Sequence, residues 1–448
     1  MRKPFSLPGT SNRHLRETVN LSIPVMIGQL GIVLTGVMDN MMVGWLSYEH
    51  LSAASLANSL FFIIVVISMG ITNAVSPLVA EADAADNKLL CATYLRQGLW
   101  VGVGSSVITM ALLEASVWVL PYLDQPPQDV LLAGSYLRWL YVSVPPMVLF
   151  LTYKQYTDGL SRTRVAMMVT IAGLLINGLV NWLLIFGNLG FPRMELDGAG
   201  IGTFVSRMAM LLLIGWYVHK GQKIGGPGLP LGSWKPDWPA MKKILSIGLP
   251  SGLQLFFEVG AFCGAVIMIG WMGAAPRSAH QIVLNMSSVT YMVVTGIAAG
   301  CTIRVGNARG RLDMLNARQA GFAGFWLGGI FMFFSALVFF FGRDFLPTLY
   351  NNHPDVLRIT PHLMIMAGLF QIFDGLQAVG LGVLRGLQDV VKPMIIAFVC
   401  YWLVALPLGY VSGFVWELGV AGVWIGFVVS LGMAAAAFMY RFRKLTKA

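Results

Sequence analysis

The sequence predicts an all-α polytopic membrane protein with twelve transmembrane helices in two pseudo-twofold-related six-helix bundles. Of its 448 residues, 56% are hydrophobic and only 11% are charged, and the mean hydropathy is +0.72. Apolar runs of about 20 residues, long enough to cross a bilayer as helices, recur along the chain. The second half of the sequence also repeats the first. The composition lies far outside the range of ordinary soluble domains.

The apolar runs are best explained as helices. Membrane β-strands would require strict alternation of apolar and polar residues, which the runs lack. A helix is then the structure that satisfies its backbone polar groups within lipid. A basic tail leads directly into the first run, so we expect no cleavable signal peptide. We expect spans at 19–43, 51–80, 93–120, 131–153, 165–187, 198–218, 243–271, 278–303, 319–341, 357–384, 393–413 and 420–440.

Basic residues predict the orientation of these spans. About 23 of the 30 Lys and Arg residues fall in the N-terminal tail, the even-numbered connections and the C-terminal end, against about four on the other side. Because cytoplasmic loops carry the excess of Lys and Arg, we expect both termini in the cytoplasm. The net charge of +10 therefore reflects topology, and we expect no nucleic-acid partner.

A shift of 226 residues aligns the two halves of the chain. It pairs Pro24 with Pro250 and Gly70 with Gly296. Since each half contains an even number of spans, both halves enter the membrane from the same side as parallel repeats, an arrangement typical of transporters. We expect an N-terminal bundle at 1–218, a cytoplasmic linker rich in Gly and Pro at 219–242, and a C-terminal bundle at 243–448.

Four acids lie inside expected spans, and three of them are site candidates to which the repeat gives no acidic counterpart. An ionised carboxylate at bilayer depth costs about 2.5 to 3.5 kcal/mol, so such a residue usually faces the bundle interior and binds something cationic. We expect these acids to bind a proton, a metal ion or a cationic substrate. The positions related by the repeat to Glu258, Asp39 and Asp374 are Ile32, Ala265 and Val148.

Five segments resemble a known family: FFEV (256–259), AHQIVLNMSS (279–288), TIRVGNARG (302–310), QIFDGLQAVGLGVLRG (371–386) and MDNMMVG (38–44). Nearly end to end, the chain resembles the multidrug and toxin extrusion (MATE) family, most nearly its NorM-like bacterial branch. The resemblance implies the MATE fold and a monomeric secondary antiporter of the bacterial cytoplasmic (inner) membrane. Such an antiporter expels organic cations and hydrophobic drugs by alternating access in exchange for Na⁺ or H⁺, without a cofactor.

The resemblance also implies roles for the three acids. Glu258 matches the family's cation-site acid on the seventh helix, and Asp374 matches its partner on the tenth. Asp39 matches the first-helix acid implicated in proton or substrate coupling. The two carboxylates of Glu258 and Asp374 can hold one Na⁺ by oxygen ligation or share a proton. Phe370 departs from the family, because sodium-coupled NorM-like members often carry a tyrosine there, so both ions stay open.

Several side chains are candidates for the lining of a substrate cavity. Asn177 and Asn181 lie four residues apart on one helix face and resemble the polar pair that faces Asp39 in the family. Hydrogen bonding between helices is the alternative role for these amides. The remaining candidates are Gln254, Gln281, Asn285 and Phe370.

Two other function classes compete with drug export. A lipid or lipid-linked oligosaccharide flippase of the same superfamily would line its cavity with several Arg or Lys residues, because its cargo carries phosphates. Several of the charged residues well inside the expected spans are instead acids, which favours a cationic cargo. A polytopic enzyme is less favoured, since the sequence contains no HExxH, GxSxG or P-loop motif.

Overall fold

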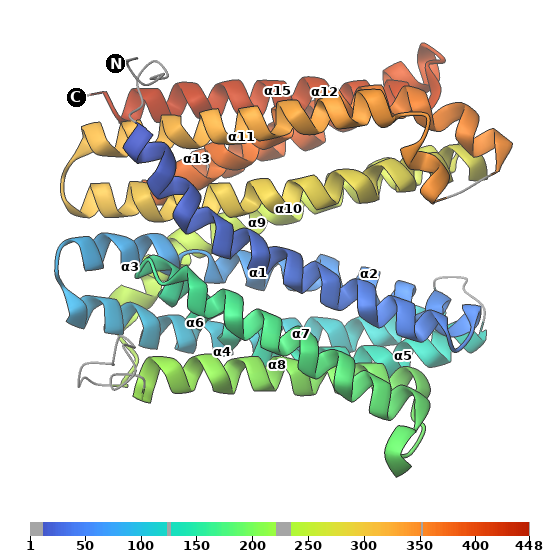
Figure 1. The fold of residues 1–448 in the computed structure, drawn as a ribbon, viewed down its shortest axis with the longest axis horizontal. Coiled ribbons are helices and arrows are strands. Elements are labelled where there is room, and N and C mark those ends of the chain that lie inside the picture. The colour runs from blue at the N-terminus through green and yellow to red at the C-terminus, as the bar shows by residue number, and fades with distance from the viewer. Residues whose placement is uncertain (1–11, 123–126, 221–233, 351–352, 448) are drawn as a thin grey trace, which may run out of the picture. The chain divides into compact units, whose positions relative to one another are not determined.

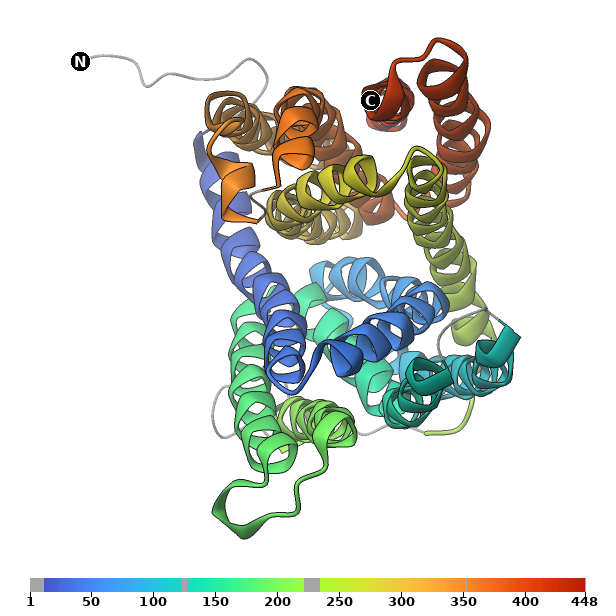
Figure 2. The same ribbon diagram turned by 90° about the vertical axis from the view of Figure 1, so that its right-hand side faces the viewer.

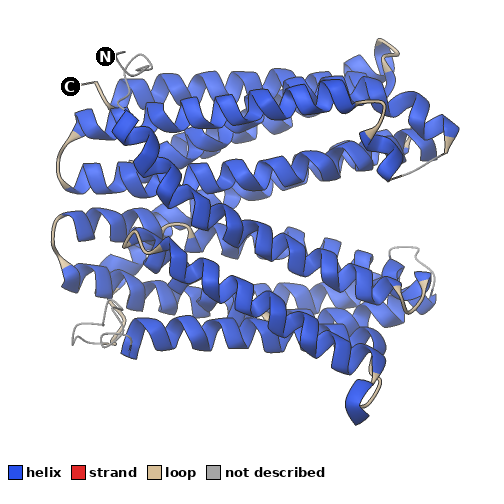
Figure 3. Ribbon diagram, in the orientation of Figure 1, coloured by secondary structure: helices blue, strands red, loops and turns tan. Residues whose placement is uncertain are grey.

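The computed structural model describes residues 12–122, 127–220, 234–350 and 353–447, and these residues form helices joined by short loops, without a strand (Figure 3). Eleven helices in the described ranges are long and apolar enough to cross a membrane, and a shorter apolar helix lies at Val130–Val142. The predicted all-α polytopic fold class is therefore confirmed.

The structure divides into two compact units, which are described here one at a time. The N-terminal unit comprises residues 27–252 and the C-terminal unit comprises residues 1–26 together with 253–448. The N-terminal unit contains most of α1 (Asn12–Gly44), then α2 (Tyr48–Thr72), α3 (Val75–Ala84), α4 (Lys88–Val119), η1 (Leu120–Tyr122), α5 (Pro127–Val142), α6 (Val144–Gly159), α7 (Thr163–Phe186), η2 (Asn188–Gly190), α8 (Glu195–Lys220) and the start of α9 (Trp238–Gly270). The green helices of this unit in Figure 2 are α7 and α8, which pack against each other and are joined by a green loop.

The C-terminal unit contains the start of α1 and the rest of α9. It continues with α10 (Ala274–Gly310), α11 (Met314–Gly342), η4 (Leu346–Leu349), α12 (Pro354–Gly386), α13 (Val391–Phe398), η5 (Val399–Ala405), α14 (Leu406–Tyr410), η6 (Val411–Val415) and α15 (Gly419–Leu445). Figure 1 shows α10, α11, α12 and α15 running along one another.

The helices α1 and α9 each contribute to both units, whereas the division expected from the sequence at 1–218 and 243–448 keeps each of them whole. The linker expected at 219–242 begins in α8, which extends to Lys220, and its last residues belong to α9, which begins at Trp238. Its middle, 221–233, lies outside the described residues.

The fourth expected span, 131–153, is interrupted in the structure. It corresponds to α5 and α6, which meet at Ser143. Pro145 and Pro146 follow after Val144 and lack a backbone N–H, so the carbonyls four residues earlier lose their helical partners. The Ser143 hydroxyl donates to the carbonyl of Leu140 at 2.6 Å. This break explains why α5 counts as a short apolar helix.

Small residues allow the same close helix contact in each unit. In the N-terminal unit, α2 meets α9 at Gly70 and Gly252, where a Cβ on Gly70 would overlap the Gly252 backbone. In the C-terminal unit, Gly296 of α10 meets Met26 of α1 in the same way. The 226-residue repeat relates the two contacts. Such close approach between helices is characteristic of membrane interfaces, where packing replaces the hydrophobic effect.

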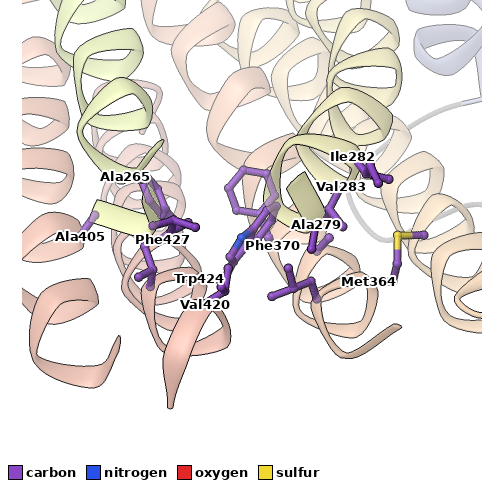
Figure 4. Packing of buried hydrophobic residues seen from close by; sticks show 14 of the residues in the cluster. Ala265, Ala279, Ile282, Val283, Met364, Phe370, Ala405, Val420, Trp424 and Phe427 are labelled. Carbon is purple, nitrogen blue, oxygen red and sulfur yellow. The ribbon is translucent and has the colours of Figure 1, made fainter. Parts of the chain in front are cut away.

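An aromatic cluster lies in the core of the C-terminal unit, beside the second half of α9. Phe370 and Trp424 pack edge to face with ring centroids 5.2 Å apart, as Figure 4 shows, and Phe262 stacks on Phe427 at 4.8 Å. Phe370 is 3% exposed. Offset and edge-to-face pairs of this kind are worth about 0.5–1.5 kcal/mol each beyond the area that they bury.

The contact between α15 and η6 leads to a stability prediction. A Cβ on Gly422 would lie 2.5 Å from the carbonyl carbon and oxygen of Ser412, which are backbone atoms that cannot rotate away. We expect Gly422→Ala to destabilise the protein by about 1–3 kcal/mol, the usual cost of overpacking. The measurement is thermal unfolding in detergent.

The control for this prediction is Gly104→Ala in α4. A Cβ at Gly104 meets nothing within 4 Å. Because alanine is about 0.5–1 kcal/mol better than glycine inside a helix, we expect an unchanged or higher Tm. Equal Tm changes in the two variants would contradict the packing argument.

Candidate functional site

A buried polar cluster surrounds Asp39 in the N-terminal unit. Asn181 of α7 donates from Nδ2 to Oδ1 of Asp39 at 2.5 Å, and Thr203 of α8 donates from its hydroxyl to Oδ2 at 3.3 Å. The same Asn181 nitrogen lies 3.3 Å from Oδ1 of Asn177, which is one turn earlier on α7. The structure thus brings together three residues that the sequence singled out, and it adds Thr203.

Gly202 makes this cluster possible. It lies next to Thr203 on α8, and a Cβ there would overlap Oδ1 of Asn181. The missing side chain lets α8 approach α7 closely enough for Thr203 to reach the carboxylate. Gly202 is therefore a positioning residue for the amide of Asn181.

Two amide atoms of the cluster have no hydrogen-bond partner among the described residues. These are Nδ2 of Asn177, which lies near the Asp39 carboxylate but beyond hydrogen-bond distance, and Oδ1 of Asn181, and both side chains are fully buried. An unpaired buried polar atom costs about 1–3 kcal/mol, so a water, ion or ligand that bonds these atoms would be stabilised. Arg207, one turn beyond Thr203, interacts electrostatically with Asp39 and donates to the hydroxyl of Ser143 at 2.6 Å.

A second cluster surrounds Glu258 in the C-terminal unit. Gln254, one turn earlier on α9, donates from Nε2 to Oε2 of Glu258 at 2.9 Å. Tyr291 of α10 donates its hydroxyl to Oε1 at 3.0 Å. The carboxylate is buried, with 6% of the residue exposed. Gln254 was expected near Glu258 because both lie on one helix face, whereas Tyr291 was not singled out.

Asp374 of α12 belongs to the same cluster. It is 5% exposed and interacts electrostatically with Glu258. Tyr401, within η5, interacts electrostatically with both acids, and its buried hydroxyl has no hydrogen-bond partner among the described residues. Arg385, three turns further along α12, interacts electrostatically with Glu258. The two carboxylates that the resemblance pairs therefore lie within electrostatic range of each other in the structure.

The remaining cavity candidates lie elsewhere. Gln281 donates from Nε2 to Oδ1 of Asn285 at 3.1 Å on an exposed face of α10, and no described hydrogen bond connects this pair with Glu258. Phe370 lies one turn before Asp374, but its ring packs in the aromatic cluster against Trp424. Phe370 is therefore part of the aromatic core next to Asp374, and its side chain offers no oxygen to an ion.

The oxygen atoms around Glu258 and Asp374 suit a monovalent cation. Within the described ranges, no group of three or more His, Cys, Asp and Glu side chains is placed to hold a metal ion. Hard cations nevertheless accept carboxylate and neutral oxygen ligands together. The unpaired hydroxyl of Tyr401 and the hydroxyl of Tyr291 bring neutral oxygens to these acids although Phe370 does not.

The sequence gives no local signal for Thr203, Tyr291 or Tyr401. Each lies on a different helix from the acid that it approaches, and only tertiary packing brings it there. Tyr291 lies one turn after the segment 279–288, but nothing in the sequence shows that this turn of α10 packs against Glu258 of α9.

The sequence model of the MatE family matches residues 24–183 and 250–411 of the chain. "Multidrug resistance protein MdtK" of Yersinia pseudotuberculosis serotype O:1b (strain IP 31758) is 32% identical over 437 residues, which cover 96% of either chain. "Probable multidrug resistance protein NorM" of Rhizobium meliloti (strain 1021) is 33% identical over 440 residues, covering 97% of this chain and 94% of the relative.

Solved structures agree with the fold. The eukaryotic MATE transporter AtDTX14 superimposes with a TM-score of 0.87 at 19% identity and covers 97% of both chains. A multidrug resistance MATE family transporter of the MOP superfamily, in its outward-facing conformation, gives a TM-score of 0.87 at 20% identity over 98% of this chain and 100% of the other.

The Glu258 cluster leads to a prediction about two tyrosines. We expect Tyr291→Phe to lower the free energy of unfolding by about 1–3 kcal/mol, because a buried carboxylate loses one of its two donors. We expect Tyr401→Phe, which removes a hydroxyl that has no described partner, to be neutral or stabilising. Thermal unfolding in sodium-free buffer measures both. A loss in Tyr401→Phe as large as that in Tyr291→Phe would contradict the assigned hydrogen bonds.

Proposed function

The chain belongs to the MATE family of transporters, and we propose that it is a secondary multidrug efflux antiporter of the bacterial cytoplasmic (inner) membrane. Family membership makes it a multi-pass membrane transporter rather than an enzyme. The proposed cargo is organic cations and hydrophobic drugs, exported in exchange for Na⁺ or H⁺. The names of the relatives MdtK and NorM, both multidrug resistance proteins, support this cargo.

One observation carries the proposal: three buried acids that lie in membrane-spanning helices and form no ion pair. Among the described residues, Asp39 and Glu258 accept hydrogen bonds only from neutral side chains, and Asp374 accepts none. Intramembrane acids are costly and mark ion or substrate pathways. A cation or proton that binds these acids offsets that cost.

The chemistry of the Glu258 cluster accommodates either coupling ion. Na⁺ would be held by the carboxylates of Glu258 and Asp374 with the hydroxyl oxygens of Tyr291 and Tyr401. A proton would instead neutralise one carboxylate and leave the other charged. Asp39, with the amides of Asn177 and Asn181, is proposed as the second coupling or substrate-binding group.

Exchange requires that ion and drug oppose each other. A ligand shifts a two-state equilibrium only through its different affinities for the two states. We propose that the coupling ion favours the state that has released the drug. Because linkage is reciprocal, the drug then weakens ion binding by the same factor.

The first test is transport by the purified protein in liposomes. Ethidium extrusion is driven separately by an imposed Na⁺ gradient and an imposed pH gradient. We expect Glu258→Gln and Asp374→Asn to lower the initial rate at least about tenfold, because an amide has no negative charge to hold Na⁺ and takes up no proton.

The matched control is Glu114→Gln, an acid of α4 that belongs to neither cluster, and it is expected to keep transport. Normal extrusion by both cluster variants would remove the Glu258 cluster from the mechanism. The absence of wild-type extrusion under either gradient would favour a flippase with a lipid cargo.

A second prediction concerns equilibrium binding. We expect the ethidium Kd of the purified protein to rise with Na⁺ concentration or with falling pH, and Glu258→Gln to flatten whichever dependence the wild type shows. Fluorescence titration in detergent measures it. A wild-type Kd that is constant in both series would rule out competition between drug and ion.

A further inference from the structure

An apolar groove of about 610 Å³ runs along α11 in the C-terminal unit. Residues of α11 between Phe322 and Phe334 supply most of its lining, and Leu376 of α12 and Met439 of α15 complete it. Gly329 lies in this lining, and a Cβ there would be 3.6 Å from Leu376. The groove contains no acid, so it differs in chemistry from the clusters around Asp39 and Glu258.

The length of the groove corresponds to one leaflet of a bilayer. From Phe322 to Phe334 the helix rises about 18 Å, close to half of the roughly 30 Å hydrocarbon core. The lining is also open to its surroundings, because Trp326 is 40% exposed and Phe334 is 61% exposed. In a membrane-spanning helix such a surface faces chains of hydrocarbon. One acyl chain therefore matches the groove in both length and polarity.

Positive charge gathers at one end of the groove. The guanidinium of Arg318 lies over the ring of Phe322, 5.9 Å from its centroid. Arg443, exposed on α15, is one turn beyond Met439 on the same helix face. The rings of Phe322 and Phe442 are 6.1 Å apart, so these ends of α11 and α15 are adjacent. In the part of the chain that the structure describes, neither arginine is paired with an acid.

The opposite end of α11 provides a comparison. Arg343 likewise lies over a phenylalanine ring, that of Phe340, at 5.1 Å. It differs in having an acidic partner, because Asp344 lies 3.5 Å away. The uncompensated charge is thus found at the groove end of the helix.

We propose that this groove binds an anionic phospholipid, with an acyl chain along α11 and the phosphate at Arg318 and Arg443. On the orientation predicted from the basic residues, these arginines face the cytoplasmic leaflet, whose anionic lipids attract Lys and Arg at the surface. The unpaired arginines Arg318 and Arg443 would repel a cationic drug at this end. The site is independent of the transport clusters.

Native mass spectrometry of the delipidated full-length chain in detergent tests the proposal. The probes are phosphatidylglycerol and phosphatidylcholine with identical acyl chains. We expect phosphatidylglycerol to bind more tightly, and Arg318→Gln and Arg443→Gln each to weaken it about fivefold without affecting phosphatidylcholine. Arg318→Lys should retain the preference. Gly329→Leu, which fills the groove, should weaken both lipids.

The matched control is Arg343→Gln, which removes an arginine with similar ring stacking and should leave both lipids unchanged. Equal binding of the two lipids by the wild type would overturn the proposal. So would an Arg343→Gln effect as large as that of Arg318→Gln, since binding would then follow overall charge. Comparison of Arg318→Gln with the conservative Arg318→Lys variant separates loss of charge from loss of folding.

Discussion

A carboxylate inside a membrane-spanning helix must be stabilised by its neighbours, because lipid offers it no hydrogen bonds. In each unit, neutral hydrogen-bond donors stabilise one such carboxylate. Asp39 receives one amide and one hydroxyl donor, and Glu258 also receives one amide and one hydroxyl donor. Neutral donors reduce the cost of burial, and Arg207 and Arg385 act on the two acids only electrostatically, without a direct ion pair among the described residues. Each site is therefore stable enough to fold and still favourable for a cation.

The internal repeat separates the frame of the molecule from its chemistry. The contacts of Gly70 with Gly252 and of Gly296 with Met26 are related by the repeat, so close helix packing has been kept in both units. The acids and their donors are not related in this way, since Ile32 stands where the repeat would place the counterpart of Glu258. One packing scheme thus carries two different polar clusters.

Much of this organisation could be predicted from the sequence because it depends on local pattern. Apolar length predicted the helices, and spacing of four predicted that Gln254 would meet Glu258. The same spacing correctly placed Gln281 beside Asn285, but it did not reveal which face of α10 they occupy. Tyr401 was missed because its distance from the acids depends on how η5 packs. The break at Ser143 was predictable in principle, since Pro145 and Pro146 stand in the sequence.

The shared helices α1 and α9 set an order for biosynthesis. The N-terminal unit includes residues up to 252, so it is complete only after the ribosome has passed the linker and begun the second repeat. The C-terminal unit includes residues 12–26, which are synthesised first. These residues can pack only after the helices of the second repeat have been synthesised. A chain divided within 221–233 would yield two fragments that each lack a helix start. Each fragment would need the missing helix start to complete its unit, so the boundary between the two repeats in the sequence does not coincide with the boundary between the two compact units.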